Sequence, residues 1–370
     1  MRMRIGVPKE IKPGENRVAM TPKGVEALRL AGADVLVQTG AGLESGFQDA
    51  EYAAAGGSMV DSAAMAWDAD LVVKVKEPLP GEFAFLSERS ALFTYLHLAA
   101  LPELTDLLLS RRVTAIAYET VSADGMLPLL RPMSEVAGIL AVQAGARGLE
   151  KSCGGRGVLL SGACGVPPGR VVVIGAGTSG RAAARTAAGV GAEVTILDVS
   201  RDSLARAAKE IPGRVRTVLS TPEAVSAEVA EADLVISTVL VVGDKAPVLI
   251  SRELLRKMKP GSAIVDISID QGGTVETSRP TTHLSPYYVE EGVVHYCVAN
   301  MPAAVPRTST VALTSATLPY VLELARDGIV NSLRKNPALR AGLNTYQGKV
   351  TCEGVAKALG KEYTSPETLL

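Results

Sequence analysis

Residues 171–180 read Val-Val-Val-Ile-Gly-Ala-Gly-Thr-Ser-Gly, an apolar run that leads directly into a glycine-rich turn. The four branched residues predict a buried strand, and the alanine- and arginine-rich segment Arg181–Val190 predicts a helix after the turn. Gly175, Gly177 and Gly180 have the Gly-x-Gly-x-x-Gly spacing. With 36 glycines in the chain, the spacing alone is weak evidence. Its position between a strand and a helix makes it specific.

Each glycine of this turn has a role in a phosphate-binding loop. The first allows the tight turn, the second lets the backbone approach a pyrophosphate, and the third lets the helix pack closely on the strand. The start of the helix then presents free N–H groups and the positive end of its dipole to the phosphates. The stretch therefore predicts a Rossmann dinucleotide-binding fold.

An acidic residue follows the next expected strand. Asp198 comes directly after Val194–Leu197. A carboxylate at this place accepts hydrogen bonds from the hydroxyls of the adenosine ribose and repels a 2′-phosphate. Asp198 therefore favours NAD over NADP as the cofactor, although the nearby Arg201 would weaken that preference.

Short apolar strands alternate with helical segments along the whole chain. Those at and after the motif are Val171–Ile174, Val194–Leu197, Leu234–Ile236 and Ala263–Val265. Those before it are Arg4–Pro8, Val35–Val37, Leu71–Val73, Ala91–Phe93 and Ala115–Ala117. Such alternation predicts mostly parallel sheets with helices on both faces.

The two series of strands predict two domains. The proline-free, alanine-rich segment Ser134–Leu149 predicts a long helix between them, and a length of 370 residues also favours two domains. We expect an α/β protein with a Rossmann NAD-binding domain, a second doubly wound α/β substrate domain, and a cleft between them. The pattern leaves open which domain the helical C-terminal segment joins.

Composition excludes several classes of function. The 38 basic and 39 acidic residues nearly balance, so no nucleic-acid partner is expected. No apolar run approaches the roughly 20 residues that span a membrane, and charged residues follow the N-terminus too soon for a signal peptide. The four cysteines show no paired or metal-binding spacing. We expect reduced thiols, no metal, and a cytoplasmic protein.

Hydride transfer from an amine or alcohol carbon needs a proton acceptor, and the chain contains only three histidines that could serve as one. His97 follows the expected strand that ends at Phe93 or Thr94, and ligands of open α/β sheets bind beyond the carboxyl ends of strands. An imidazole titrates near neutral pH, as a general base requires. Position alone does not separate this reading from a structural histidine, and the same holds for His283 and His295.

Fixed charges also lie beside expected strands. Arg17 can grip a carboxylate through two nitrogens, and Lys76 can act as a point charge on a carbonyl or carboxylate. Asp270 lies in the loop Asp266–Gly273, beside the expected nicotinamide site. Solvated surface charges, or a turn-forming aspartate, are the competing interpretations.

The sequence resembles the alanine dehydrogenases over essentially its whole length. The motifs that carry the resemblance are Ile5–Glu10, Asn16–Ala19, Lys74–Pro78, Leu96–Ala99, Pro132–Gly138, Asp266–Gly273 and Val298–Pro302. Several are shared with transhydrogenase subunits and so indicate a superfamily. Their combination with His97 and Asp270 is more specific.

The resemblance implies reversible oxidative deamination of L-alanine to pyruvate and ammonia with NAD. It implies that Arg17 and Lys76 hold the carboxylate and carbonyl of the substrate, and that His97 and Asp270 are the acid–base pair. The division of labour between these two stays open. One position departs from the family pattern: Ser203 stands where relatives often carry a basic residue shortly after the ribose-binding aspartate.

The resemblance also implies the cofactor site and the assembly. Beyond the turn Gly175, Gly177, Thr178, Ser179 and Gly180, the NAD-lining positions would be Ser134, Asp198, Ser220, Val239, Leu240, Ile267, Ser268, Ile269, Asp270, Arg279, Val298, Ala299, Asn300 and Met301. The C-terminal helices would return to the first domain. This gives a substrate domain of residues 1–130 and 307–370, an NAD-binding domain of residues 131–306, and a homo-hexamer.

Three other functions remain as alternatives. A related amino-acid dehydrogenase, for example one acting on lysine derivatives, would need an additional charged pocket group, which we cannot identify in the sequence. A nucleotide-binding transhydrogenase-like subunit would not need Arg17, Lys76 and His97 together. A catalytically silent NAD(H) sensor would use the nucleotide motif alone.

Overall fold

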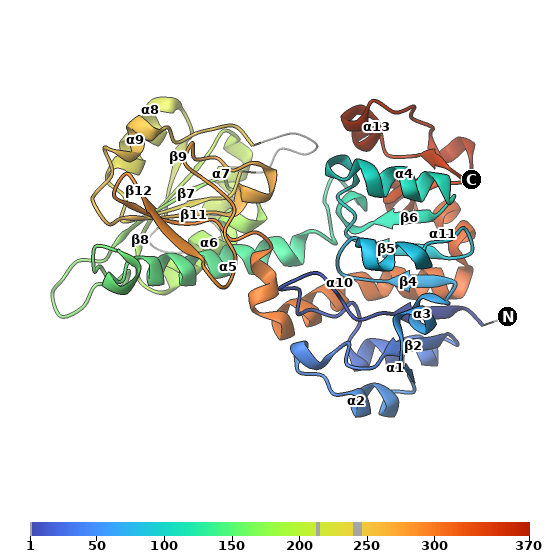
Figure 1. Ribbon diagram of the computed structural model, residues 1–370. Helices are drawn as coiled ribbons and strands as arrows, with labels where there is room; N and C mark the ends of the chain where they lie inside the picture. The colour runs from blue at the N-terminus through green and yellow to red at the C-terminus, as the bar shows by residue number, and fades with distance from the viewer. Residues whose placement is uncertain (1, 212–214, 240–245) are drawn as a thin grey trace. The chain divides into compact units, whose positions relative to one another are not determined.

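The chain forms two compact units in the computed structural model (Figure 1), which describes residues 2–211, 215–239 and 246–370. The first unit contains Met1–Met133 and Ala303–Leu370, and the second contains Ser134–Pro302. The sequence placed these boundaries after residues 130 and 306. Each unit is built on a mostly parallel sheet, which confirms the prediction of two α/β domains. The cleft between the two domains stays a prediction.

The described part of the second unit forms a seven-stranded sheet in the order β12-β13-β11-β10-β7-β8-β9. The strands are β7 (Arg170–Ile174), β8 (Glu193–Asp198), β9 (Val215–Leu219), β10 (Leu234–Ser237), β11 (Ala263–Asp266), β12 (Tyr287–Glu290) and β13 (Val293–Tyr296). Only β12 runs antiparallel to its neighbour among these strands. Glu291 and Gly292 connect it to β13 with positive φ angles of 49° and 76°, as a tight two-residue hairpin requires.

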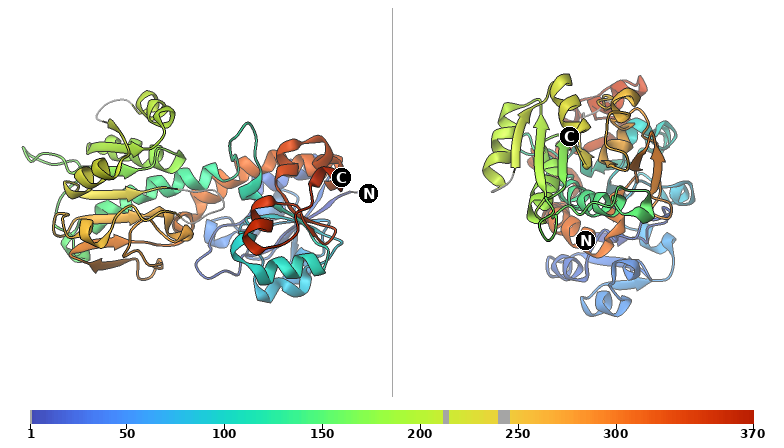
Figure 2. Two further views of the ribbon diagram at one scale, coloured as in Figure 1. Left: turned by 90° about the horizontal axis from the view of Figure 1, so that it is seen from above. Right: turned by 90° about the vertical axis from the view of Figure 1, so that its left-hand side faces the viewer.

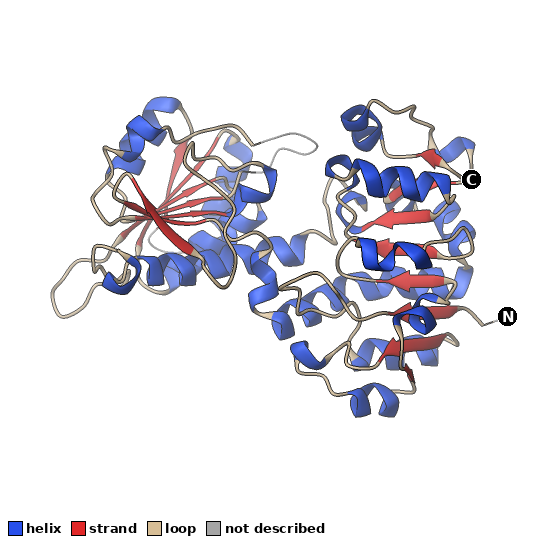
Figure 3. Cartoon of the chain, in the orientation of Figure 1, coloured by secondary structure: helices blue, strands red, loops and turns tan. Residues whose placement is uncertain are grey.

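Helices cover both faces of this sheet, as the colouring in Figure 3 shows. The helices are α5 (Arg131–Gly148), α6 (Thr178–Gly189), α7 (Arg201–Glu210), α8 (Pro222–Ala230) and α9 (Arg252–Leu255). Successive residues of β7 point to opposite faces. Val171 and Val173 pack in one core with residues of α5, α6 and α7, whereas Val172 and Ile174 pack in another with residues of α8 and α9.

The described part of the first unit forms an eight-stranded sheet in the order β15-β14-β6-β5-β4-β1-β2-β3. The strands are β1 (Arg4–Val7), β2 (Asp34–Gln38), β3 (Ser58–Val60), β4 (Leu71–Val73), β5 (Ala91–Thr94), β6 (Thr114–Ala117), β14 (Leu343–Tyr346) and β15 (Lys349–Val350). The strands β1 to β6 pair in parallel, and the C-terminal β14 adds to β6 in the antiparallel direction. The C-terminal segment therefore completes the first sheet.

Helices also pack on the first sheet, and Figure 2 shows both units from two further directions. They are α1 (Pro22–Leu30), α2 (Asp49–Ala54), α3 (Ala63–Trp67), α4 (Pro102–Ser110), α10 (Pro306–Asp327), α11 (Ile329–Lys335), α12 (Pro337–Ala341) and α13 (Glu353–Leu359). One core joins Leu104 and Leu108 of α4 and Val355 of α13 to Val72 and Leu92 of the sheet.

Three elements differ from their predicted form. The long helix α5 begins at Arg131 instead of Ser134, because Pro132 fits in a first helical turn, where its missing N–H is not needed. Helix α6 begins at Thr178 instead of Arg181, directly after the glycine turn. The helical segment that the sequence predicts after Thr308, for example Ser315–Ala325, is part of the longer helix α10, which continues through Pro319.

Two general expectations can be compared with the structure. All four cysteines are free thiols. Among the described helices, none combines the length and the apolar character that crossing a membrane requires.

Candidate active site

The glycine turn after β7 has the shape of a phosphate cradle. Gly175 has a φ of 102°, in the left-handed region that favours glycine. A Cβ on Gly180 would lie 1.8 Å from the carbonyl oxygen of Gly175, so helix α6 approaches the turn as closely as only glycine permits. A Cβ on Gly177 would meet no atom within 4 Å. The space beside Gly177, at the N-cap of α6, is therefore open to a ligand, and the turn fits the pyrophosphate of a dinucleotide.

Asp198, the last residue of β8, is bonded to this turn. Its carboxylate accepts the backbone N–H of Ala176 at 2.6 Å and that of Ser200 at 2.7 Å. A carboxylate has about four lone-pair positions, so it can still accept ribose hydroxyls. Ser203 uses its backbone N–H in a cap with the hydroxyl of Ser200. Asp198 therefore fixes the turn in addition to its predicted part in cofactor binding.

The motif at the start of α5 explains how α5 packs on α6. The hydroxyl of Ser179 donates to the carbonyl oxygen of Ser134 at 2.8 Å. A Cβ on Gly138 would lie 2.1 Å from the carbonyl oxygen of Ser179. A Cβ on Gly145, two turns later, would lie 2.4 Å from the Leu234 side chain of β10. The glycines of α5 thus permit close packing, and the Ser179 hydroxyl is bonded within the protein.

The loop after β11 is built around a buried aspartate. Asp266 accepts hydrogen bonds from the N–H groups of Ser268 and Thr274 and from the hydroxyl of Ser278, and burial raises its pKa. Asp270 lies in the short 3-10 helix η6 (Ile267–Gln271) and is exposed. The first of the two aspartates shapes the loop, whereas the second is available to a ligand.

Arg279 is held over an aromatic ring. Its guanidinium carbon lies 4.0 Å from the ring centroid of Tyr288, and its backbone N–H donates to the Tyr288 hydroxyl at 3.0 Å. His295 stacks on the same tyrosine, donates from Nδ1 to the Val293 carbonyl and accepts from the Thr277 hydroxyl. Burial lowers the pKa of His295, so this histidine is a neutral structural residue.

Most of the predicted cofactor positions share one edge of the second sheet. They follow or end its parallel strands, whose carboxyl ends lie at the same edge. Those positions are Gly175 after β7, Asp198 in β8, Ser220 after β9, Val239 after β10, Ile267–Asp270 after β11, and Val298–Met301 after β13. Leu240 lies outside the described residues.

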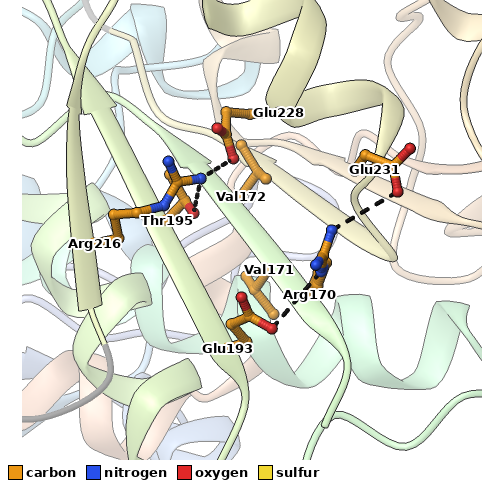
Figure 4. Close-up of a pocket in the computed structure, with 8 residues that line it drawn as sticks. All are labelled: Arg170, Val171, Val172, Glu193, Thr195, Arg216, Glu228 and Glu231. Atoms are coloured by element: carbon orange, nitrogen blue, oxygen red, sulfur yellow. Dashed lines mark hydrogen bonds and ion pairs between the residues drawn. The ribbon is translucent and has the colours of Figure 1, made fainter. Parts of the chain in front are cut away.

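A cavity of about 170 Å³ lies at the opposite edge (Figure 4). Arg170 and Glu193 are the first residues of β7 and β8, and they form an ion pair of 3.7 Å. Figure 4 marks this pair with a dashed line. Arg216 pairs with Glu228 and also donates to Thr195. Ligands of open α/β sheets bind at the carboxyl ends of the strands. We therefore do not assign the active site to this cavity.

In the first unit, Arg17 is buried against a carboxylate. Its side chain is 2% exposed, and Nε and Nη2 bond the two oxygens of Glu15 at 2.6 and 2.5 Å. Nη1 lies 3.0 Å from the sulfur of Met133. A guanidinium that donates hydrogen bonds to both oxygens of one carboxylate cannot rotate freely. Glu15 therefore orients Arg17, the predicted carboxylate-binding residue.

Lys76 follows β4 in a segment fixed by a second buried network. Lys74 is 0% exposed, and its Nζ lies 3.1 Å from Glu10 Oε2 and 2.7 Å from Glu82 Oε1. Glu10 also accepts the backbone N–H of Val75 at 2.6 Å. Lys76 itself is half-buried, and the hydroxyl of Thr94 donates to its carbonyl oxygen. The two lysines of the motif thus have different environments.

His97 lies beyond β5, where the sequence placed it, and 44% of its side chain is exposed. Its ring stacks on that of Tyr95, with centroids 6.1 Å apart and planes 10° apart. The hydroxyl of Tyr95 donates to the Leu129 carbonyl at 2.6 Å. Burial raises the pKa of Tyr95, and the nearby Arg17 guanidinium acts in the opposite direction. Tyr95 thus stacks on His97 and also lies near the Arg17 guanidinium.

The structure therefore groups three of the four predicted substrate and catalytic residues in one unit. Arg17, Lys76 and His97 belong to the first unit, and Asp270 belongs to the second. Sequence reasoning missed Glu15 and Glu119, the carboxylates that contact Arg17 and His97. Glu119 had a detectable signal, because it follows a strand that is parallel and adjacent to the strand before His97.

These features define a dinucleotide-binding α/β protein with a second α/β unit that carries a buried arginine and an exposed histidine. The chain belongs to the alanine dehydrogenase/PNT family. The family model of the N-terminal domain matches residues 6–137, and that of the C-terminal domain matches residues 141–353.

Individual relatives match over their full length. The chain is 54% identical to the alanine dehydrogenase of Bacillus subtilis (strain 168) over 369 residues, which cover 100% of this chain and 98% of the relative. A solved structure of an L-alanine dehydrogenase matches with a TM-score of 0.93 and 48% identity, over 97% of this chain and 99% of that one. The crystal structure of a transhydrogenase from Sinorhizobium meliloti matches with a TM-score of 0.81 and 25% identity, over 95% and 99%.

Proposed function

We propose that this protein catalyses the reversible oxidative deamination of L-alanine to pyruvate and ammonia, with NAD as the oxidant. The observation that carries the proposal is the arrangement around Tyr95. A buried cation, Arg17, and an exposed imidazole, His97, lie near the same aromatic ring. Such a pair suits a small substrate with a carboxylate and an exchangeable proton. Relatives that carry the name alanine dehydrogenase support the choice of alanine.

In the proposed reaction, Arg17 binds the carboxylate of alanine and Lys76 lies beside its amino-bearing carbon. NAD, held by the residues at the carboxyl edge of the second sheet, would supply the acceptor for the hydride of the alanine Cα, and the oxidised substrate would be an imine. Lys76 then stabilises the negative charge that develops on oxygen when water adds to the imine. His97 or Asp270 removes the proton of this water and later protonates the departing ammonia.

The residues that hold the cofactor in this proposal are those at the carboxyl edge of the second sheet. The Gly175–Gly180 turn would bind the pyrophosphate, and Asp198 would bind the adenosine ribose. Arg279, oriented by Tyr288, would contribute a positive charge. We further propose the domain roles expected above, with the substrate in the first unit, and a homo-hexameric assembly, which the mass of the protein in solution would test.

Purified full-length protein is expected to reduce NAD with alanine and not with the other proteinogenic amino acids at equal concentration. Two reasons support this expectation: relatives carry the name alanine dehydrogenase, and the sequence shows no additional charged pocket group of the kind a longer side chain would need. The increase in NADH absorbance across the set of amino acids measures this. Activity with a larger or charged amino acid would favour a related dehydrogenase. No reduction with any of them would favour the transhydrogenase-like or sensor alternatives.

Replacing Asp198 with alanine is expected to weaken NAD binding about tenfold or more and NADP binding much less. The substitution removes the hydrogen bonds between the carboxylate and the adenosine ribose, which weakens the binding of both cofactors. It also removes the repulsion of a 2′-phosphate, which partly offsets the loss for NADP. Titration of protein fluorescence with both reduced cofactors measures the two dissociation constants. Because Asp198 also holds Ala176 and Ser200, Asp198→Asn serves as the control that keeps one acceptor oxygen. Equal weakening of both cofactors would contradict the ribose role.

A further inference from the structure

The Glu119 carboxylate lies next to His97 and has no role in the proposed reaction. Strands β5 and β6 are parallel neighbours, with Thr94 paired to Ala117. His97 lies shortly after the end of the first strand, and Glu119 lies in the short 3-10 helix after the second. Because the carboxyl ends of parallel strands lie at the same edge, the sheet itself brings Glu119 to His97.

The Glu119 carboxylate bonds the backbone on which His97 stands. It accepts the N–H of Leu96 at 3.1 and 3.2 Å through its two oxygens. Oε1 also accepts the N–H of His97 at 2.6 Å and lies 3.9 Å from the ring nitrogen Nδ1. The Glu119 side chain is only 18% exposed, so competition from water is limited. Hydrogen bonds to a carboxylate are among the stronger ones in proteins.

The backbone of His97 requires such support. Its φ of 51° and ψ of 34° lie in the left-handed region, which residues with a Cβ rarely adopt. The same conformation turns the chain out of strand β5 and exposes the imidazole. The surroundings must therefore hold this conformation, and the two N–H bonds to Glu119 do so on one side, while the ring of Tyr95 supports the imidazole on the other.

We propose that Glu119 is the positioning residue of His97. It acts by fixing the backbone at His97 and thereby the direction of the imidazole. The inference rests on the proposed alanine oxidation. Glu119 itself exchanges no proton with the substrate. Proton transfer depends steeply on distance and alignment, so a displaced imidazole slows the step without removing the group.

The test compares Glu119→Ala, Glu119→Gln and the control Glu88→Ala. Alanine at 119 removes both acceptors, and we expect kcat to fall about 10- to 100-fold. Glutamine keeps one oxygen that can accept, and we expect a fall of about 3- to 10-fold. Glu88 is an exposed carboxylate of the same unit, paired with Arg112 at 3.5 Å, and its removal should leave kcat within about twofold. NADH binding should stay within about twofold in all three variants.

Two readouts separate positioning from a loss of folded protein. A slower proton transfer raises the ratio of kcat in H2O to kcat in D2O, whereas a smaller active fraction leaves this ratio unchanged. The ring signal of His97 in a proton–carbon NMR spectrum should also shift in the Glu119 variants. With three histidines in the chain, it is identified by its loss in His97→Asn. The signals of His283 and His295 should not move.

An unshifted His97 signal, or a Glu119→Ala variant with kcat within twofold of wild type, would overturn the inference. If Glu119→Ala does not fold, the glutamine variant still decides, because an unchanged solvent isotope effect in it would count against positioning. The NMR measurement needs neither alanine nor NAD. It therefore tests the contact between Glu119 and His97 even if the wild-type protein shows no alanine oxidation, which would refute the proposed function instead.

Discussion

Replacing His97 with asparagine is expected to lower kcat for alanine oxidation by about 10²- to 10⁴-fold, the usual contribution of a general acid–base group. Asparagine is chosen because it tolerates the left-handed backbone of this position better than alanine does. The variant should therefore fold like the wild type, and the loss would come from the missing proton carrier. Steady-state rates of NADH formation with saturating alanine measure the effect.

Asp270→Asn is expected to lower kcat on the same scale. Asp270 is exposed on η6, beyond the carboxyl end of β11, so its replacement should leave the fold of the second unit intact. The neighbouring Asp266, which is buried and accepts three hydrogen bonds, gives a useful contrast. Asp266→Asn should lower the melting temperature, whereas Asp270→Asn should not, because only the first aspartate supports the loop.

The double variant shows whether the two groups act together. If His97 and Asp270 serve the same proton transfer, the double variant should lose little more than the worse single variant. If they serve different steps, the losses should multiply. NADH binding is the control in every case. It should stay within about twofold of wild type in His97→Asn, and it should persist in the Asp270 variants, where one predicted cofactor contact changes but the nucleotide turn remains. Near-normal turnover in both single variants would remove these residues from the mechanism.

The fold was predictable wherever strands are short, apolar and flanked by helices. The runs that became β4, β7 and β11 are almost wholly buried, and burial on both faces gives a continuous apolar run. Strand β9 lies at the sheet edge and contains the exposed Arg216, so it has no such run and was missed. The C-terminal β14 was missed for another reason, because its pairing with β6 joins segments distant in sequence.

The candidate site was predictable to the extent that its residues follow strands. Asp198 and His97 were predicted as site residues because open sheets place ligands at the carboxyl ends of their strands. Glu15 follows no strand and so carries no such signature. Glu119 does follow a predicted strand, but its contact with His97 becomes visible only when the pairing of β5 with β6 is known. Residues that orient a functional group therefore require the three-dimensional structure more than the group itself does.

Lys74→Met is expected to destabilise the first unit by about 3–5 kcal/mol near neutral pH. Lys74 is 0% exposed and is the cation between Glu10 and Glu82, whose side chains are each 3% exposed. Methionine would leave two buried carboxylates without their counter-ion. Calorimetric melting of both proteins measures the change. Lys361→Met is the matched control, because its pair with Asp106 is exposed, and it should cost less than about 1 kcal/mol.

The pH dependence of this loss follows from Glu10. Burial raises the pKa of Glu10, while Lys74 lowers it. Without Lys74 the folded-state pKa rises further above that of the unfolded chain. The folded protein then binds the proton more tightly, so the variant loses stability as the pH rises through this interval. The difference from wild type should therefore be smaller at about pH 5 than at about pH 8.

A triple variant separates charge from packing in this cluster. Lys74→Met combined with Glu10→Gln and Glu82→Gln contains no buried charge at these three positions, and glutamine oxygen can still accept the N–H of Val75. Neutral replacement of a buried ionic group is often tolerated, so this variant should regain most of the lost stability. The additional pH dependence that Lys74→Met introduces between about pH 5 and 8 should also disappear. If the triple variant is no more stable than Lys74→Met, then the lysine stabilises the unit through its packed alkyl chain, and Lys76 is held in place by shape instead of charge.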